Sequence, residues 1–153
     1  MIKYLTIDNF LNNHYFNKLC NLDFKTKVKP ENQRIYSNKV FSDGRVKFSC
    51  LSKNCIREFF NTYHKKLINI LNDLYPEKVG SYEWTRIDII ETGANHKFII
   101  HDDIDVLLSG VIYLKPEKNL GTIFYDSKKD HNRTMVPWKQ NRAVFFSRRE
   151  KES

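Results

Sequence analysis

A histidine and two aspartates follow a short apolar run in the segment Phe98-Ile99-Ile100-His101-Asp102-Asp103. If this segment is a strand, side chains two positions apart point the same way, so His101 and Asp103 share one face and Asp102 points to the other. A neutral imidazole and a carboxylate on one face are ligands that suit a divalent metal ion with open coordination positions. The spacing therefore predicts a metal site at His101 and Asp103. A His-x-Asp tripeptide also arises often by chance, so the surrounding segments have to support the assignment.

The helices that accompany this pair are predicted from apolar residues that recur every three to four positions. Asp8 can cap a first helix, and a longer helix begins near Asn54 and is stopped by Pro76. The apolar positions are Phe10, Leu11, Tyr15, Phe16 and Leu19 in the first helix, and Ile56, Phe59, Phe60, Tyr63, Leu67, Ile70, Leu71 and Leu74 in the second. Both stripes indicate packing against a core.

From Tyr82 onward the period changes to two, which is typical of strands. The predicted strands are residues 82–91, 97–101, 107–114, 121–125 and 142–147, and a polar loop is expected over 126–140. Two earlier strands, 33–41 and 46–51, flank the turn Ser42-Asp43-Gly44 and predict a hairpin. Helices packed on a mainly antiparallel sheet indicate an α+β fold, a double-stranded β-helix or jelly roll.

Four segments in this order resemble the Fe(II)- and 2-oxoglutarate-dependent oxygenase superfamily, in particular its prolyl-hydroxylase-like branch. In that branch the metal-ligand pair is followed by a strand ending in Tyr-Leu, a strand beginning with Gly, a polar loop, and an Arg-hydrophobic-Phe-Phe-Ser strand that leads to a distal histidine. The corresponding segments are His101-Asp102-Asp103, Ser109-Gly110-Val111-Ile112-Tyr113-Leu114, Gly121-Thr122-Ile123-Phe124-Tyr125 and Asn141-Arg142-Ala143-Val144-Phe145-Phe146-Ser147. The resemblance covers roughly residues 82–153.

The resemblance implies that His101 and Asp103 bind Fe(II), with 2-oxoglutarate as co-substrate and O2 as oxidant. A dioxygenase of this kind hydroxylates a peptidyl residue or a small molecule and releases succinate and CO2. It also implies that Ser109 and Tyr113 face the co-substrate, although Tyr113 can equally be a core aromatic residue. Arg142 could bind a carboxylate of 2-oxoglutarate, or it could form a surface ion pair. Glu91 departs from the family, because many members have a tyrosine there.

The third iron ligand is expected beyond Ser153, since the distal histidine of the family follows the Phe-Phe-Ser strand by several residues. His131 is the one histidine downstream of the pair, and it could substitute for that ligand. We expect one domain over residues 1–153, with helices and a hairpin in 1–81 and the jelly-roll core in 82–153. That core would lack its last strands, so the chain is expected to be a fragment.

Composition bounds the remaining function classes. The chain has a net charge of +8, and residues 1–50 carry nine basic side chains against four acidic ones. We interpret this excess, around Lys25, Lys27 and Lys29, as a solvated face, so nucleic acid is not an expected partner. The sequence has no apolar run long enough for a membrane span and no secretory signal, and its three cysteines do not match a zinc pattern. A cytoplasmic protein is expected, with its substrate and oligomeric state left open.

The alternative is a non-catalytic jelly-roll binding module, in which His101 and Asp103 are remnants of a lost metal site. Such a module could bind nucleic acid through its basic N-terminal third, and its affinity would then fall steeply with added salt.

Overall fold

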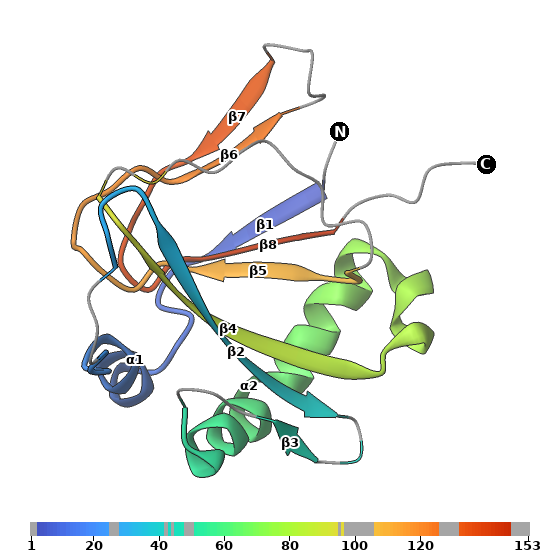
Figure 1. Cartoon of the computed structure of the whole chain (residues 1–153). Helices are drawn as coiled ribbons and strands as arrows, with labels where there is room; N and C mark the ends of the chain where they lie inside the picture. Colours follow the sequence, from blue (N-terminus) through green and yellow to red (C-terminus); the bar gives the residue numbers. More distant parts are fainter. Residues whose placement is uncertain are drawn as a thin grey trace. The chain divides into compact units, whose positions relative to one another are not determined.

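The chain is both helical and β-stranded in a computed structural model that describes residues 3–24, 28–41, 43, 45–47, 51–94, 96, 106–125 and 132–147 (Figure 1). The elements are β1 (Lys3–Ile7), α1 (Asn13–Cys20), β2 (Gln33–Phe41), β3 (Val46–Lys47), α2 (Lys53–Leu74), the 3-10 helix η1 (Pro76–Ser81), β4 (Trp84–Thr92), β5 (Ser109–Ile112), β6 (Thr122–Tyr125), β7 (Arg133–Val136) and β8 (Ala143–Ser147). All of the strand pairs are antiparallel among these residues, so the α+β class is confirmed.

The chain divides into two compact units. Unit 1 joins Met1–Phe24 to Ile100–Ser153, and unit 2 is Lys25–Ile99. The single domain predicted over residues 1–153, with its core in 82–153, stays a prediction.

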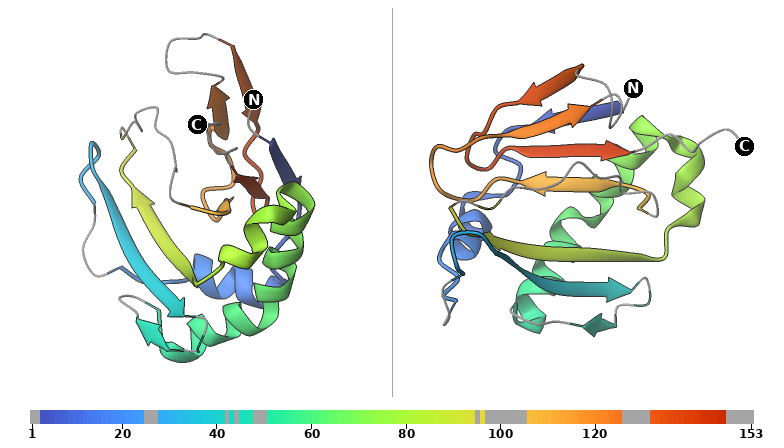
Figure 2. Two further views of the ribbon diagram at one scale, coloured as in Figure 1. Left: turned by 90° about the vertical axis from the view of Figure 1, so that its right-hand side faces the viewer. Right: turned by 45° about the horizontal axis from the view of Figure 1, so that its top comes forward.

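Unit 2 consists of the helix α2 and the sheet β3-β2-β4. The long strands β2 and β4 pair along their whole length, from Gln33 opposite Thr92 to Phe41 opposite Trp84 (Figure 2). The helix begins after Ser52, whose side chain accepts a hydrogen bond from the backbone N–H of Cys55, and it ends before Pro76. The second predicted helix and the predicted hairpin are therefore confirmed, although residues 48–50 lie outside the described part.

Unit 1 contains a sheet in the order β1-β8-β5 and the separate hairpin β6-β7. The pairing is nested, because β5 pairs with β8 while the two strands between them in the sequence pair with each other (Figure 1). A core cluster of Tyr113, Val136 and Val144 is packed against the partly buried Phe124, Trp138 and Phe146. The hairpin and the larger sheet of this unit therefore share apolar contacts.

The N-terminal helix starts later than predicted. Asn12, and not Asp8, is its cap, and the Asn12 side chain accepts a hydrogen bond from the backbone N–H of Tyr15 at 2.8 Å. Phe10 and Leu11 are buried before the helix begins, so their apolar character reflects a clasped loop rather than a helical stripe. Residues 3–7, for which no element was predicted, form β1 and pair with β8.

The predicted loop over 126–140 is wrong at its centre, where Arg133–Val136 form β7. Only Val136 of this strand is buried, and its other side chains are exposed. The pairing with β6 therefore stabilises a strand that has almost no apolar alternation for sequence analysis to detect.

No helix in the described part of the chain is both long and apolar enough to cross a membrane. The two cysteines within it, Cys20 and Cys55, are free thiols. Cys55 is buried in α2 and Cys20 is half-buried at the end of α1.

Candidate functional site

The predicted metal ligands His101 and Asp103 lie outside the described residues, as do Asp102, the predicted strand 97–101 and His131. Within the described ranges, no three side chains of His, Cys, Asp or Glu come together in a way that could hold a metal ion. The site must therefore be built from the residues that follow the pair: Ser109, Tyr113 and Arg142.

Strand β5 presents Ser109 and Val111 on one face of its sheet. Ser109 stands opposite Phe146 of β8, and Val111 stands opposite Val144. Because alternate side chains of a strand share a face, Ser109, Val111 and the following Tyr113 are on the same side as Val144 and Phe146. Val144 and Phe146 belong to the cluster that packs with the β6-β7 hairpin. The shared parity predicted for Ser109, Val111 and Tyr113 is thus the side that faces this hairpin.

Tyr113 is buried, and its ring stacks on the indole of Trp138 with 4.4 Å between the ring centroids. Its hydroxyl lies 2.6 Å from the Thr122 hydroxyl of β6. Two hydroxyl groups that share one hydrogen bond retain a second O–H donor between them. Tyr113 is therefore a core aromatic residue, and its hydroxyl pair can still donate to a carboxylate.

Trp138 and Thr122 are the residues that sequence reasoning missed. Trp138 lies in the predicted polar loop, and its indole N–H donates to the Pro116 carbonyl at 2.9 Å. Thr122 lies in a predicted strand, but only the pairing of β6 with β7 and the packing of this hairpin bring it to Tyr113. An aromatic residue next to Pro137 was the one available sequence signal.

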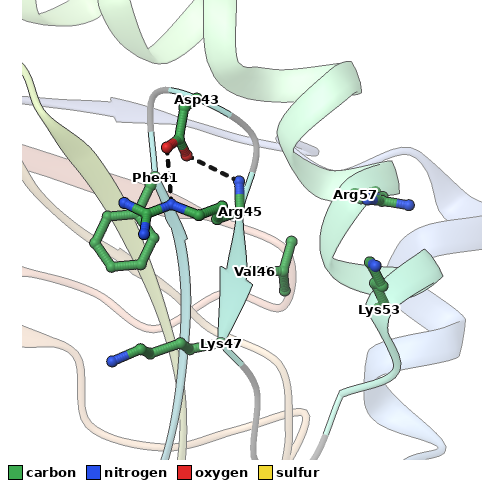
Figure 3. Close-up of a pocket in the computed structure, with 7 residues that line it drawn as sticks. All are labelled: Phe41, Asp43, Arg45, Val46, Lys47, Lys53 and Arg57. Carbon is green, nitrogen blue, oxygen red and sulfur yellow. Dashed lines mark hydrogen bonds and ion pairs between the residues drawn. The ribbon is translucent and has the colours of Figure 1, made fainter.

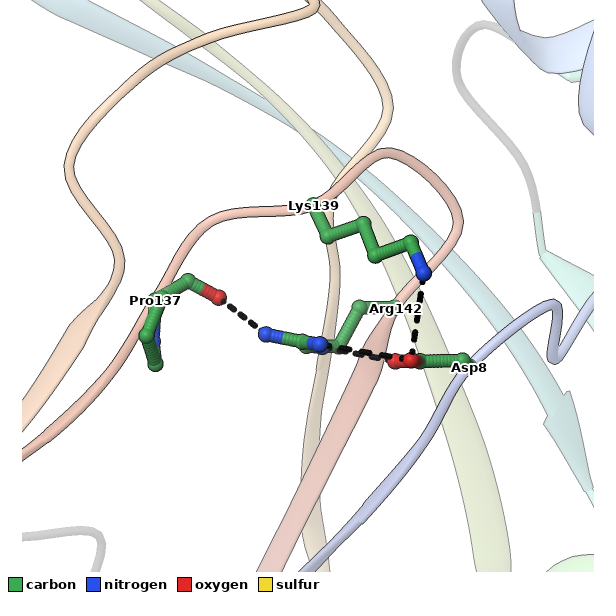
Figure 4. A network of polar contacts seen from close by, with 4 residues as sticks. All are labelled: Asp8, Pro137, Lys139 and Arg142. Carbon is green, nitrogen blue, oxygen red and sulfur yellow. Dashed lines mark hydrogen bonds and ion pairs between the residues drawn. The ribbon is translucent and has the colours of Figure 1, made fainter.

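Arg142 is held in an ion pair with Asp8 at the end of β1 (Figure 4). Its Nε donates to Asp8 Oδ1 at 2.6 Å, its Nη2 donates to Oδ2 at 3.2 Å, and its Nη1 donates to the Pro137 carbonyl at 2.8 Å. Lys139 Nζ also lies 3.4 Å from Asp8 Oδ2. The guanidinium fork is thus bonded on both sides, which corresponds to the surface ion pair of the two alternatives.

These bonds make the network around Asp8 sensitive to acid. Hydrogen bonding to Arg142, and then the charges of Arg142 and Lys139, lower the pKa of Asp8 below its ordinary value of 3.8. A lowered pKa in the folded protein means that the ionised form stabilises the fold above pH 3.8, and that this contribution is lost as the pH falls through the folded-state pKa.

Asp8→Asn is expected to lower the melting temperature slightly at pH 7, because the pair is solvent-exposed and screened. The difference from the wild type is expected to vanish in acid, once the Asp8 carboxylate itself is protonated. Thermal unfolding followed by circular dichroism from pH 7 down to about pH 2 measures this. Glu117→Gln is the control, since Glu117 has no ion pair among the described residues. A constant difference at every pH would contradict the assignment.

The remaining polar candidates have local structural partners. Glu91 Oε1 accepts a hydrogen bond from the backbone N–H of Val28 at 3.3 Å, whereas its Oε2 is buried without a partner in the described part of unit 2. The His64 ring stacks on Phe60, and His96 Nδ1 lies 3.1 Å from the Glu31 carbonyl oxygen. None of these contacts brings the side chains to the Tyr113 region of unit 1.

Comparisons of the chain with protein-family models, with curated proteins and with solved structures found no match.

Proposed function

We propose that this protein is an Fe(II)- and 2-oxoglutarate-dependent oxygenase with a jelly-roll fold, in which His101 and Asp103 bind the iron. The observation that carries the proposal is the ordered series of four family-like segments over residues 101–147. The donor set fits divalent iron, because one imidazole and one carboxylate from positions i and i+2 leave coordination positions for a third ligand and for a co-substrate.

The strand pairing of unit 1 supports the jelly roll. In a jelly roll, a pair of strands in one sheet encloses a pair that belongs to the facing sheet. The pairing of β5 with β8 around the β6-β7 hairpin has this nested form, and the apolar cluster of Tyr113, Val136 and Val144 joins the two layers. The segment that carries His101 and Asp103 immediately precedes β5 in the sequence.

Each described residue then has a defined place in the proposed site. Ser109 and Tyr113 face the layer between the sheet and the hairpin, where the hydroxyl pair of Tyr113 and Thr122 would donate to a carboxylate of 2-oxoglutarate. Arg142 is left out of the proposed site, because its guanidinium is already bonded to Asp8 and Pro137.

When bound, iron and 2-oxoglutarate supply the oxidation, in which 2-oxoglutarate is decarboxylated to succinate and CO2 and the substrate is hydroxylated. The substrate that we propose is a peptidyl residue or a small molecule, by analogy with the family. The chain itself contributes the ligands, the orientation of the co-substrate and a packed apolar surround. The cytoplasmic location stays a prediction.

Binding of Fe(II) and 2-oxoglutarate under anaerobic conditions tests the proposal directly. It should be measured by calorimetry on the chain and on the full product of its gene, with succinate release in air as the activity assay. The expected result is binding of both ligands and succinate formation that requires iron in the full product. A protein that binds neither ligand in either form would be the non-catalytic jelly-roll module instead.

A further inference from the structure

A basic hollow lies in unit 2 between the β2-β3 hairpin and the first two turns of α2 (Figure 3). Its volume is about 490 Å³. The residues that line it are Phe41, Asp43, Arg45, Val46, Lys47, Lys53 and Arg57. Four of these side chains are cationic and one is acidic, so the lining carries an excess of positive charge.

The single acid does not neutralise this excess, because it is engaged by one cation. Asp43 accepts hydrogen bonds from the backbone N–H of Arg45 at 3.0 Å and from its Nε at 2.7 Å. These bonds lower the pKa of Asp43, so the carboxylate is ionised and committed to Arg45. Within the described residues, Lys47, Lys53 and Arg57 have no carboxylate partner.

The position of Lys53 and Arg57 on α2 is not explained by the stability of the helix. Lys53 is the first residue of α2 and Arg57 follows one turn later, and the first turn contains no acidic residue. The amino end of a helix carries a partial positive charge, so a cation there is destabilising, typically by about 0.3–1 kcal/mol. A bound anion would compensate for both the helix end and the side chains.

The arrangement of the cations suits an extended anion rather than a single phosphate. Arg45 and Lys47 project from the hairpin, Lys53 and Arg57 lie on the helix, and Val46 points from the hairpin toward the helix between them (Figure 3). The charges therefore line two sides of the hollow and do not meet at one point. A chain of phosphates can contact both sides in succession.

An aromatic and guanidinium stack lies at the hairpin side of the hollow. The Arg45 guanidinium lies 4.8 Å from the centroid of the Phe41 ring, and the Arg45 side chain is 74% exposed. A guanidinium plane that rests on an aromatic ring offers its outer face to a nucleobase, and such stacking tolerates any base. This feature favours a nucleic acid over an acidic peptide, which has no planar groups to place there.

We propose that the basic hollow binds the phosphodiester backbone of a single-stranded nucleic acid. Unit 2 carries fourteen Lys and Arg residues against eight Asp and Glu, which is six of the net eight positive charges of the chain. The inference departs from the expectation that nucleic acid is not a partner, and it does not depend on the proposed oxygenase activity. RNA and DNA share the recognised chemistry, and the experiment separates them.

Fluorescence anisotropy with labelled strands of about 20 nucleotides tests the proposal on the whole chain. Single-stranded RNA and DNA of one sequence are compared between about 50 and 200 mM salt, with polyglutamate as a competitor. The wild type is expected to bind and to lose affinity steeply with salt. The triple variant Lys47→Gln, Lys53→Gln, Arg57→Gln is expected to bind at least about ten-fold more weakly, with a shallower salt dependence by roughly 0.7 per lost phosphate contact.

The matched control removes three charges outside the hollow, by Lys65→Gln, Lys118→Gln and Arg133→Gln. Equal losses in both triple variants would overturn the proposal, because net charge alone would then explain binding. Competition by polyglutamate as effective as that by unlabelled RNA would also overturn it, in favour of an acidic protein partner. A preference for RNA or for DNA would identify the source of the backbone.

Discussion

Replacing either His101 or Asp103 with alanine in the full gene product is expected to abolish succinate release. Each residue would supply one of three protein ligands to the iron, and no neighbouring side chain can replace a ligand from the same face of the strand. Changes to residues that only orient metal ligands already weaken metal binding by about 10–100-fold, so loss of a ligand should weaken Fe(II) binding by at least about 100-fold. Calorimetry with Fe(II) under anaerobic conditions and a succinate assay measure both effects.

Asp102→Ala is the matched control for these variants. It removes a carboxylate from the same tripeptide, but in an extended strand its side chain points to the opposite face from His101 and Asp103. Fe(II) binding and succinate release should therefore stay close to those of the wild type. Activity that survives in Asp103→Ala and disappears in Asp102→Ala would refute the proposed ligand pair.

Replacing Asn141 with alanine is expected to cause the largest loss of stability in unit 1. The Asn141 side chain is 4% exposed and clasps the backbone of Leu11, accepting from its N–H at 3.0 Å and donating to its carbonyl at 2.7 Å. The Asn141 backbone bonds to Phe10 and Tyr113 as well. An unsatisfied buried backbone group costs about 1–3 kcal/mol, and two such groups would be left.

The backbone of Asn141 adds to this loss, since its φ of 62° lies in the left-handed region, where alanine costs about 1–2 kcal/mol. The total expected for Asn141→Ala is about 3–5 kcal/mol, measured by urea unfolding. Asn9→Ala is the control, because Asn9 is exposed and has a φ of 53°. It should show the backbone cost alone. Equal losses in the two variants would mean that the clasp around Leu11 contributes nothing.

Elements with a strong local pattern were predictable from the sequence. The apolar stripe from Ile56 to Leu74 predicts α2, and Pro76 marks its end, because proline cannot continue the hydrogen-bond ladder of a helix. Strand β2 was predicted with the bounds that the structure has, because turn residues follow it directly. The Asp8 cap and the loop over β7 were wrong, since an acid before apolar residues and a polar run each allow several structures.

The sequence by itself determined the α+β class, the long helix, most of the strands and the His-x-Asp pair that carries the functional proposal. These depend on side chains a few positions apart, where helix and strand geometry decide which residues share a face. Tertiary structure alone decided that β1 pairs with β8, that Arg142 bonds to Asp8 and that Asn141 clasps Leu11. Such contacts join residues about 130 positions apart in the sequence, and their energies come from burial and pairing that no local pattern encodes.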